Sequence, residues 1–313
     1  MIRRHRSAIV VALAMLLIQP LQADDVTPRS RFSGHLRELG LMGRRGEGSA
    51  PESATIAYIK MICVESRVDF RDEPLDDLVE DHSYSRALTA HIGGEKDDLL
   101  VIIVPLNGHA DGPEGEGDAG IALALCAIQE LSEGIRGGRR LPISLDITFL
   151  GGERRGSFSE GATSGTGTRW WIANIDESRA TAVIYLSIDK LPGALGLRNA
   201  SPGGLSPYWF YERTRSALAE SGFEYRLFPN RMQGYRLGLL ARPGPIVPYL
   251  GAGIPAVELR NEEGGGTLAD PSGSFMKFLD SAIAANGKGF INTWDRDYST
   301  FQVGTISFVI REG

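Results

Sequence analysis

Four residues with carboxylate or imidazole side chains follow apolar or Gly-rich stretches of the chain and could bind a metal ion together: His109, Asp118, Glu153 and Asp189. These side chains are the kinds of ligand that Zn²⁺ or a similar divalent ion takes in proteins. An acid beside the ion that is not itself a ligand could act as general base toward a bound water. The sequence therefore suggests a metal site, provided that the fold brings the four residues together.

The segments around these residues alternate between strand and helix patterns. Apolar runs of strand length, typical of buried strands, occupy residues 99–104, 144–150, 182–188 and 254–259. Helical spacing of apolar residues occurs from a start near Ser53 through Cys63, over residues 121–135 and over residues 208–220. This alternation predicts an α/β fold of three layers, with a mostly parallel central sheet flanked by helices. Ligands of such sheets bind beyond the carboxyl ends of the strands, so the four residues are expected at one edge.

Each of the four residues also has an interpretation without a metal. Asp118 stands where the dipole at the N-terminus of a helix favours an acid. A single histidine in a loop is more often a surface residue than a ligand, and Glu153 and Asp189 could be ordinary loop acids. Residues 115–120 also match the dinucleotide pattern G-x-G-x-x-G. Residues 105–114 separate that motif from the preceding strand, and its two acids would repel phosphates, so we do not expect nucleotide binding.

Composition and charge narrow the class of protein. The chain has 313 residues, of which 42% are hydrophobic and 23% are charged, as in an ordinary globular protein. Its net charge of −6 repels phosphate backbones, so nucleic acid is not an expected partner. A peptide or a small molecule is the expected ligand, and the sequence does not predict an oligomeric state.

The N-terminal segment has the layout of a secretory signal peptide. Basic residues precede an apolar run over residues 8–18, and Pro20 and a small residue at Ala23 follow it. This run is too short to cross a hydrocarbon core of about 30 Å. We expect residues 1–23 to be removed on export to the periplasm or the extracellular space, which leaves a mature chain without a membrane span. Residues 24–55 are polar and are expected to form an irregular N-terminal lead-in.

Two further groups of residues could have structural or functional roles. Cys63 and Cys126 lie in apolar surroundings, which favours two separate buried thiols, although an oxidising compartment would permit a disulfide. Four aromatic residues could line a carbohydrate pocket, but packing in the core is the favoured interpretation: Trp170, Trp171, Trp294 and Tyr298.

The order of the motifs resembles that of the co-catalytic zinc aminopeptidases of metallopeptidase family 28, which include the glutaminyl cyclases. The similar stretches are Gly-His-Ala-Asp at 108–111, Gly-Asp-Ala-Gly at 117–120, Phe-Leu-Gly-Gly-Glu at 149–153, Asp189 and Gly-Ile-Pro-Ala at 253–256. The resemblance implies one zinc-exopeptidase-like domain over residues 56–313 with two adjacent metal sites.

The resemblance also implies a role for each matching residue. One zinc site would use His109, Asp118 and Asp189. The other would share Asp118 and add a second Glu and a late His. Glu153 would be the general base, and Asp111 would orient His109 from behind.

The chain departs from this pattern at the second metal site. Arg154 stands where the family has its second Glu, and Asn292 is the nearest match to the late His. No histidine follows His109 in the sequence, so both private ligands of one ion are missing and at most one zinc is expected. Arg154 could act as a surrogate cation beside Asp118 or Glu153, but it cannot activate a water as Zn²⁺ does.

These observations lead to two hypotheses about function. The first is an exported zinc-aminopeptidase-like protein that keeps one metal site, is impaired or inactive as a peptidase and acts as a binding scaffold. The alternative is an active aminopeptidase or hydrolase with a single metal, in which Glu153 is the general base.

Overall fold

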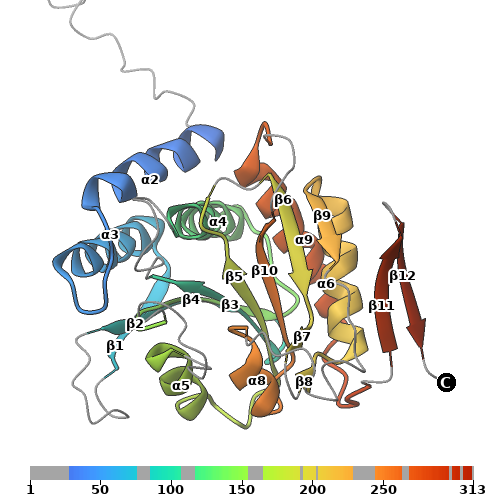
Figure 1. Cartoon of the computed structure of the whole chain (residues 1–313). Coiled ribbons are helices and arrows are strands. Elements are labelled where there is room, and N and C mark those ends of the chain that lie inside the picture. Colours follow the sequence, from blue (N-terminus) through green and yellow to red (C-terminus); the bar gives the residue numbers. More distant parts are fainter. Residues whose placement is uncertain are drawn as a thin grey trace, which may run out of the picture.

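The computed structural model describes residues 28–75, 85–106, 117–153, 165–190, 193–201, 204–227, 244–262, 268–295, 298–303 and 306–311. Within these residues an eight-stranded sheet forms the middle layer of the molecule, and helices cover both of its faces (Figure 1). The predicted three-layer α/β fold is therefore confirmed. His109, Asp111, Arg154 and residues 1–23 lie outside the described residues.

The central sheet is mixed but has a parallel centre. Its strands, in spatial order, are β1 (Asp69–Pro74), β2 (Arg86–Ile92), β4 (Ser144–Leu150), β3 (Leu99–Pro105), β5 (Thr181–Ser187), β10 (Ala256–Glu262), β6 (Ala194–Arg198) and β9 (Glu224–Leu227). The four central strands β4, β3, β5 and β10 run parallel. Strands β1, β2 and β6 pair antiparallel with their neighbours toward the centre of the sheet, and β9 runs parallel to β6.

Two hydrophobic cores lie on opposite faces of the sheet. One face packs against α2 (Pro28–Met42), α3 (Ala50–Ser66), α4 (Asp118–Arg136), α6 (Tyr208–Ser221) and α9 (Pro271–Asn286), and the other against α5 (Thr166–Ala173) and α8 (Val247–Gly251) (Figure 1). Alternate residues of β3 belong to the two cores: Leu100, Ile102 and Val104 to the first, and Leu99, Val101 and Ile103 to the second. Because β3 is buried on both faces, its sequence is a continuous apolar run.

Most elements predicted from apolar patterns are present, with small shifts at their ends. Strands β3, β4, β5 and β10 and helices α4 and α6 cover the predicted segments. Helix α3 begins earlier than predicted, because Ser49 rather than Ser53 is its N-cap. The Ser49 side chain accepts a hydrogen bond from the backbone N–H of Glu52 at 3.3 Å, and a proline follows in the first turn.

The expectation of an irregular segment over residues 24–55 is wrong, because α2 occupies Pro28–Met42. Only a narrow stripe of this helix is apolar, with Phe32 and Leu39 buried in the first core. Between them His35 is buried, with Nδ1 2.7 Å from Tyr58 Oη and Nε2 3.0 Å from Gln129 Oε1. Because His35 is polar, it interrupts the helical spacing of apolar residues in this segment. The spacing therefore did not predict the helix.

The remaining elements lie at the ends of the sheet or beside it. Strands β7 (Ala200–Ser201) and β8 (Gly204–Leu205) form a short pair, and β11 (Tyr298–Val303) and β12 (Ile306–Arg311) form a separate hairpin (Figure 1). No helix within the described part of the chain is long and apolar enough to cross a membrane.

Both cysteines are buried and free, which confirms two separate core thiols. Burial raises the pKa of each thiol, Cys63 and Cys126, to about 12. The aromatic residues Trp170, Trp171 and Tyr298 are also buried, and Trp294 packs partly against the second core. These four side chains therefore pack in or against the cores, which was the favoured interpretation from the sequence.

Candidate functional site

The carboxyl ends of the central strands bring three of the predicted residues to one edge of the sheet. The backbone N–H of Leu106, just after β3, donates to Leu150 at the end of β4 at 2.9 Å. The first turn of α4 lies against the end of β5, where Gly117 N–H donates to the Asp189 carbonyl at 3.2 Å. The edge thus carries Asp118, Glu153 and Asp189, whereas Asn292 is exposed in the segment between α9 and β11.

Asp118 forms a buried ion pair with an arginine that the sequence analysis did not select. Arg45 lies in the loop between α2 and α3, and its Nη2 atom is 2.5 Å from Asp118 Oδ1. The two side chains are 2% and 7% exposed, so water does little to screen their attraction. The Arg45 Nε–H also donates to the carbonyl of Leu106 at 2.8 Å, directly after β3. The guanidinium therefore joins the end of a central strand to the start of α4.

The loop that carries Arg45 is held by a second buried acid. Glu52, in the first turn of α3, is 1% exposed. Its Oε2 atom accepts a hydrogen bond from Gly48 N–H at 2.6 Å, and its Oε1 atom accepts one from Ser85 Oγ–H, next to β2. A Cβ atom at Gly151, after β4, would overlap both Ser85 Oγ and Glu52 Oε1. The N-terminal segment is consequently fitted closely to the same edge of the sheet.

Glu153, the predicted general base, is buried among hydrogen-bond donors. Its Oε1 atom accepts from Thr168 N–H at 2.5 Å, and its Oε2 atom accepts from Thr168 Oγ1–H at 2.7 Å and Tyr185 Oη–H at 2.8 Å. Tyr249 Oη lies 3.1 Å from Thr168 Oγ1, and burial together with the negative charge of Glu153 raises the pKa of Tyr249 well above its usual value. Glu153 thus connects the end of β4 to α5 and β5, and Thr168 extends this network to Tyr249 on α8.

These partners of Glu153 were missed by sequence reasoning, although one signal was present. Tyr185 places a hydroxyl in the buried apolar middle of β5, and such a group needs a partner when it is buried. Thr168 lies in a Gly-rich stretch with no periodic pattern, and Tyr249 lies in a five-residue helix. Spacing in the sequence could not have connected these two residues to Glu153.

Asp189 differs from the other two acids because it is only half-buried. Its backbone N–H donates to Asn261 Oδ1, on β10, at 2.7 Å. The neighbouring turn is tight, since a Cβ atom at Gly120 would lie 3.0 Å from the Ile188 carbonyl oxygen. A glycine at this position allows α4 to pack directly on the end of β5, and this packing places Asp118 and Asp189 at the same edge.

The described residues do not fit a zinc site. Among them, no three His, Cys, Asp or Glu side chains lie close enough together to hold a metal ion. Asp118, the acid that both family sites would share, already has a permanent cation 2.5 Å from Oδ1. Arg45 thus supplies a positive charge at Asp118, whereas the expected role of Arg154, which lies outside the described residues, stays a prediction.

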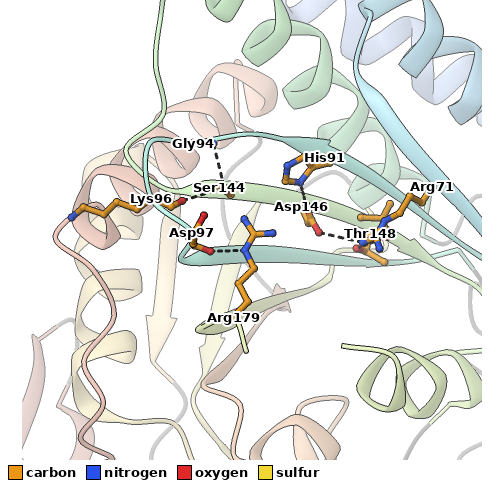
Figure 2. Close-up of polar contacts among 10 residues, drawn as sticks. Arg71, His91, Gly94, Lys96, Asp97, Ser144, Asp146, Thr148 and Arg179 are labelled. Atoms are coloured by element: carbon orange, nitrogen blue, oxygen red, sulfur yellow. Dashed lines mark hydrogen bonds and ion pairs between the residues drawn. The ribbon is translucent and has the colours of Figure 1, made fainter. Parts of the chain in front are cut away.

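A second buried aspartate lies at the opposite end of β4 (Figure 2). Asp146 Oδ1 is 2.6 Å from His91 Nδ1, on β2, and Oδ2 is 3.9 Å from Arg71 Nη2, on β1. The His91 and Arg71 side chains are 39% and 66% exposed, respectively. The partners of Asp146 are therefore open to solvent, unlike the partner of Asp118.

Solved structures share this fold at low sequence identity. The glutaminyl cyclase of Fimbriiglobus ruber is 15% identical with a TM-score of 0.60, and the match covers 84% of this chain and 95% of that one. A leucine aminopeptidase precursor from Bacteroides thetaiotaomicron is 12% identical with a TM-score of 0.57, covering 83% and 97%. A Zn-dependent exopeptidase from Parabacteroides distasonis is 14% identical with a TM-score of 0.52, covering 84% and 97%.

The chain thus has the α/β fold of zinc-dependent exopeptidases and glutaminyl cyclases, as the motif order implied. No curated protein matches it in sequence. The family described as TP_0564_1st, first domain, matches residues 121–310, which is more than half of the chain. This stretch contains Glu153 and Asp189 and begins three residues after Asp118. The chain therefore belongs to the TP_0564 family, of which it carries the first domain.

Proposed function

We propose that this protein is an exported binding protein on a zinc-exopeptidase-like fold and that it does not hydrolyse peptides. The observation that carries the proposal is the buried ion pair between Arg45 and Asp118. Peptide hydrolysis on this fold would need a cation that activates water. A guanidinium neutralises a carboxylate, but it stays protonated and offers no open coordination position, so it cannot lower the pKa of a bound water as a metal ion does.

The environment of Glu153 supports the same proposal. A general base needs a lone pair directed at the proton that it removes. The two oxygen atoms of Glu153 accept hydrogen bonds from Thr168 N–H, Thr168 Oγ1–H and Tyr185 Oη–H. These donors stabilise the carboxylate where it lies and tie α5 to β5. The role of Glu153 in this proposal is therefore to hold the site together.

The ligand that we propose is a peptide or a small molecule bound at the carboxyl edge of the sheet. Ligands of open α/β sheets bind beyond the ends of the strands, where β4, β3 and β5 end in this protein. Asp189 is the half-buried acid of this edge, and it would favour a ligand with a positively charged group. Residues 1–23 would direct the chain out of the cytoplasm.

An activity assay with a matched variant tests the proposal. The mature chain is incubated with aminoacyl chromogenic substrates and with a peptide that has N-terminal glutamine, each with and without added Zn²⁺. The Fimbriiglobus ruber glutaminyl cyclase serves as the positive control on the cyclisation substrate. We expect neither hydrolysis nor cyclisation from this protein or from Glu153→Gln. Turnover that is lost in Glu153→Gln would support the single-metal hydrolase instead.

A further inference from the structure

We infer that Arg45 takes the place of the site cation, so that the protein carries its own positive charge at Asp118 and binds no divalent ion on that carboxylate. The inference extends the proposed function at the same site and rests on it. It differs from the expectation from sequence, in which one zinc site survives on His109, Asp118 and Asp189.

The first argument is the position of the charge. A carboxylate oxygen binds Zn²⁺ at about 2.0–2.2 Å. Arg45 Nη2 is 2.5 Å from Asp118 Oδ1, so the guanidinium occupies the space in which an ion on that oxygen would lie. An ion on the second oxygen would lie within a few ångströms of the guanidinium. In a site where both side chains are buried, the repulsion between the two cations would be only weakly screened.

The second argument is that Arg45 is held in place from several sides. Its Nε–H donates to the Leu106 carbonyl, and the loop that carries it is tied to Glu52 through Gly48 N–H. Glu52 in turn accepts a hydrogen bond from Ser85. To displace Arg45, a metal ion would have to break a buried ion pair and move a loop that several buried hydrogen bonds hold.

The third argument concerns the pattern of missing ligands. In the family pattern Asp118 would be shared by both ions, so one guanidinium at Asp118 removes a ligand from each site. The second site has in addition Arg154 and Asn292 where its private ligands would stand. One guanidinium at this carboxylate therefore competes with both of the family's ions at once.

Metal binding to the unmodified chain tests the inference directly. The mature protein is titrated with ZnCl₂ in a calorimeter, its zinc content is measured after dialysis, and its melting temperature is recorded with Zn²⁺ and with EDTA. We expect less than about 0.1 zinc per chain and the same melting temperature in both conditions. One zinc per chain in the wild type, lost in Asp118→Asn, would overturn the inference even if no Arg45 variant folds.

Variants of the two adjacent arginines sharpen the test. Arg45→Ala should lower the melting temperature, because it leaves Asp118 buried without its partner. Arg45→Ala/Asp118→Asn removes the uncompensated charge and should recover part of that loss. Arg44→Ala is the matched control, because Arg44 is exposed in the same loop, and it should behave as the wild type. An Arg45→Ala chain as stable as the wild type would contradict the inference, because Asp118 would then not depend on the charge of Arg45.

The two proposals can fail separately. Zinc bound at Asp118 without turnover would refute the role of Arg45 and leave the binding protein standing. Peptide turnover that does not require zinc would refute the proposed function and leave the ion pair in place.

Discussion

Two buried aspartates lie toward opposite ends of the central strands, but the two sites are built differently. At the carboxyl edge, Asp118 pairs with Arg45, and both side chains are almost inaccessible to solvent. At the opposite end, Asp146 pairs with His91 and Arg71, whose side chains are 39% and 66% exposed (Figure 2). Arg45 comes from a distant loop, whereas His91 lies directly opposite Asp146 in the paired strand β2.

This difference in exposure determines how strongly each aspartate depends on its partner. A cation that reaches solvent keeps most of its hydration and contributes little to stability. A cation buried against a carboxylate has lost its hydration, so each partner becomes costly without the other. Within the described residues the carboxyl edge is thus organised around a permanent internal charge, and the opposite end around an ordinary surface cluster.

The largest expected effect is that of removing Arg45. Arg45→Met should lower the free energy of unfolding by about 3–5 kcal/mol, because it leaves Asp118 buried without its partner. Arg71→Met is the matched change at the other aspartate and should cost no more than about 1 kcal/mol. Urea denaturation of both variants gives the comparison, and equal losses would contradict the distinction between the sites. Arg45→Met with Asp118→Leu should cost less than Arg45→Met alone.

A smaller effect is expected at Glu153. Tyr185→Phe should cost about 1.5–3 kcal/mol, because a hydrogen bond to a charged acceptor is lost and Glu153 stays buried. Tyr225→Phe, at a half-buried tyrosine of β9, is the control and should change stability by less than about 0.5 kcal/mol. Equal unfolding curves for the two variants would mean that the Glu153 network does not stabilise the carboxyl edge.

At the opposite end, single changes should be mild and the double change should not be additive. His91→Ala is expected to cost about 1 kcal/mol or less, since Arg71 still faces Asp146. His91→Ala with Arg71→Met leaves Asp146 without either partner, and its cost should exceed the sum of the single losses. A purely additive double mutant would show that Asp146 does not depend on these partners.

The smallest effect is a dependence on pH that comes from His35 on α2. Burial lowers the pKa of His35 from its usual 6.5, so the folded protein holds it neutral. The unfolded chain then binds its proton first as the pH falls below about 6.5, and stability is lost in that range. His35→Gln should show a weaker loss between pH 7 and 5 than the wild type. Parallel stability curves for the two proteins would exclude this role of His35.

Elements of the fold were predicted correctly where the burial of a single strand or helix sets its own pattern of apolar residues. Strands such as β3 and β5 are buried on both faces, so a continuous apolar run identified them without any knowledge of their neighbours. Helix α2 was missed, because its buried stripe contains His35, whose partners Tyr58 and Gln129 lie on other helices. A local pattern cannot show that such a polar residue will be satisfied.

At the candidate site, too, the sequence predicted where residues lie but not which side chains they contact. Placement of Asp118, Glu153 and Asp189 after strands was enough to predict that they share one edge, because parallel strands end together. Their actual partners are Arg45, Thr168 and Tyr185, which come from a loop, a short helix and a neighbouring strand. His109, Asp111 and Arg154 lie outside the described residues, so their predicted roles stay predictions.

The sequence by itself determined the layers of this protein and the edge at which its acids gather, because burial of apolar runs and the geometry of parallel strands follow from local pattern. Only the tertiary structure decided which cation meets Asp118. Arg44 and Arg45 are adjacent and chemically identical in the sequence, yet one is exposed and the other buried. The path of the loop, which hydrogen bonds to Glu52 hold, determines that Arg45 is buried and Arg44 is exposed. The spacing of residues along the chain does not predict this path.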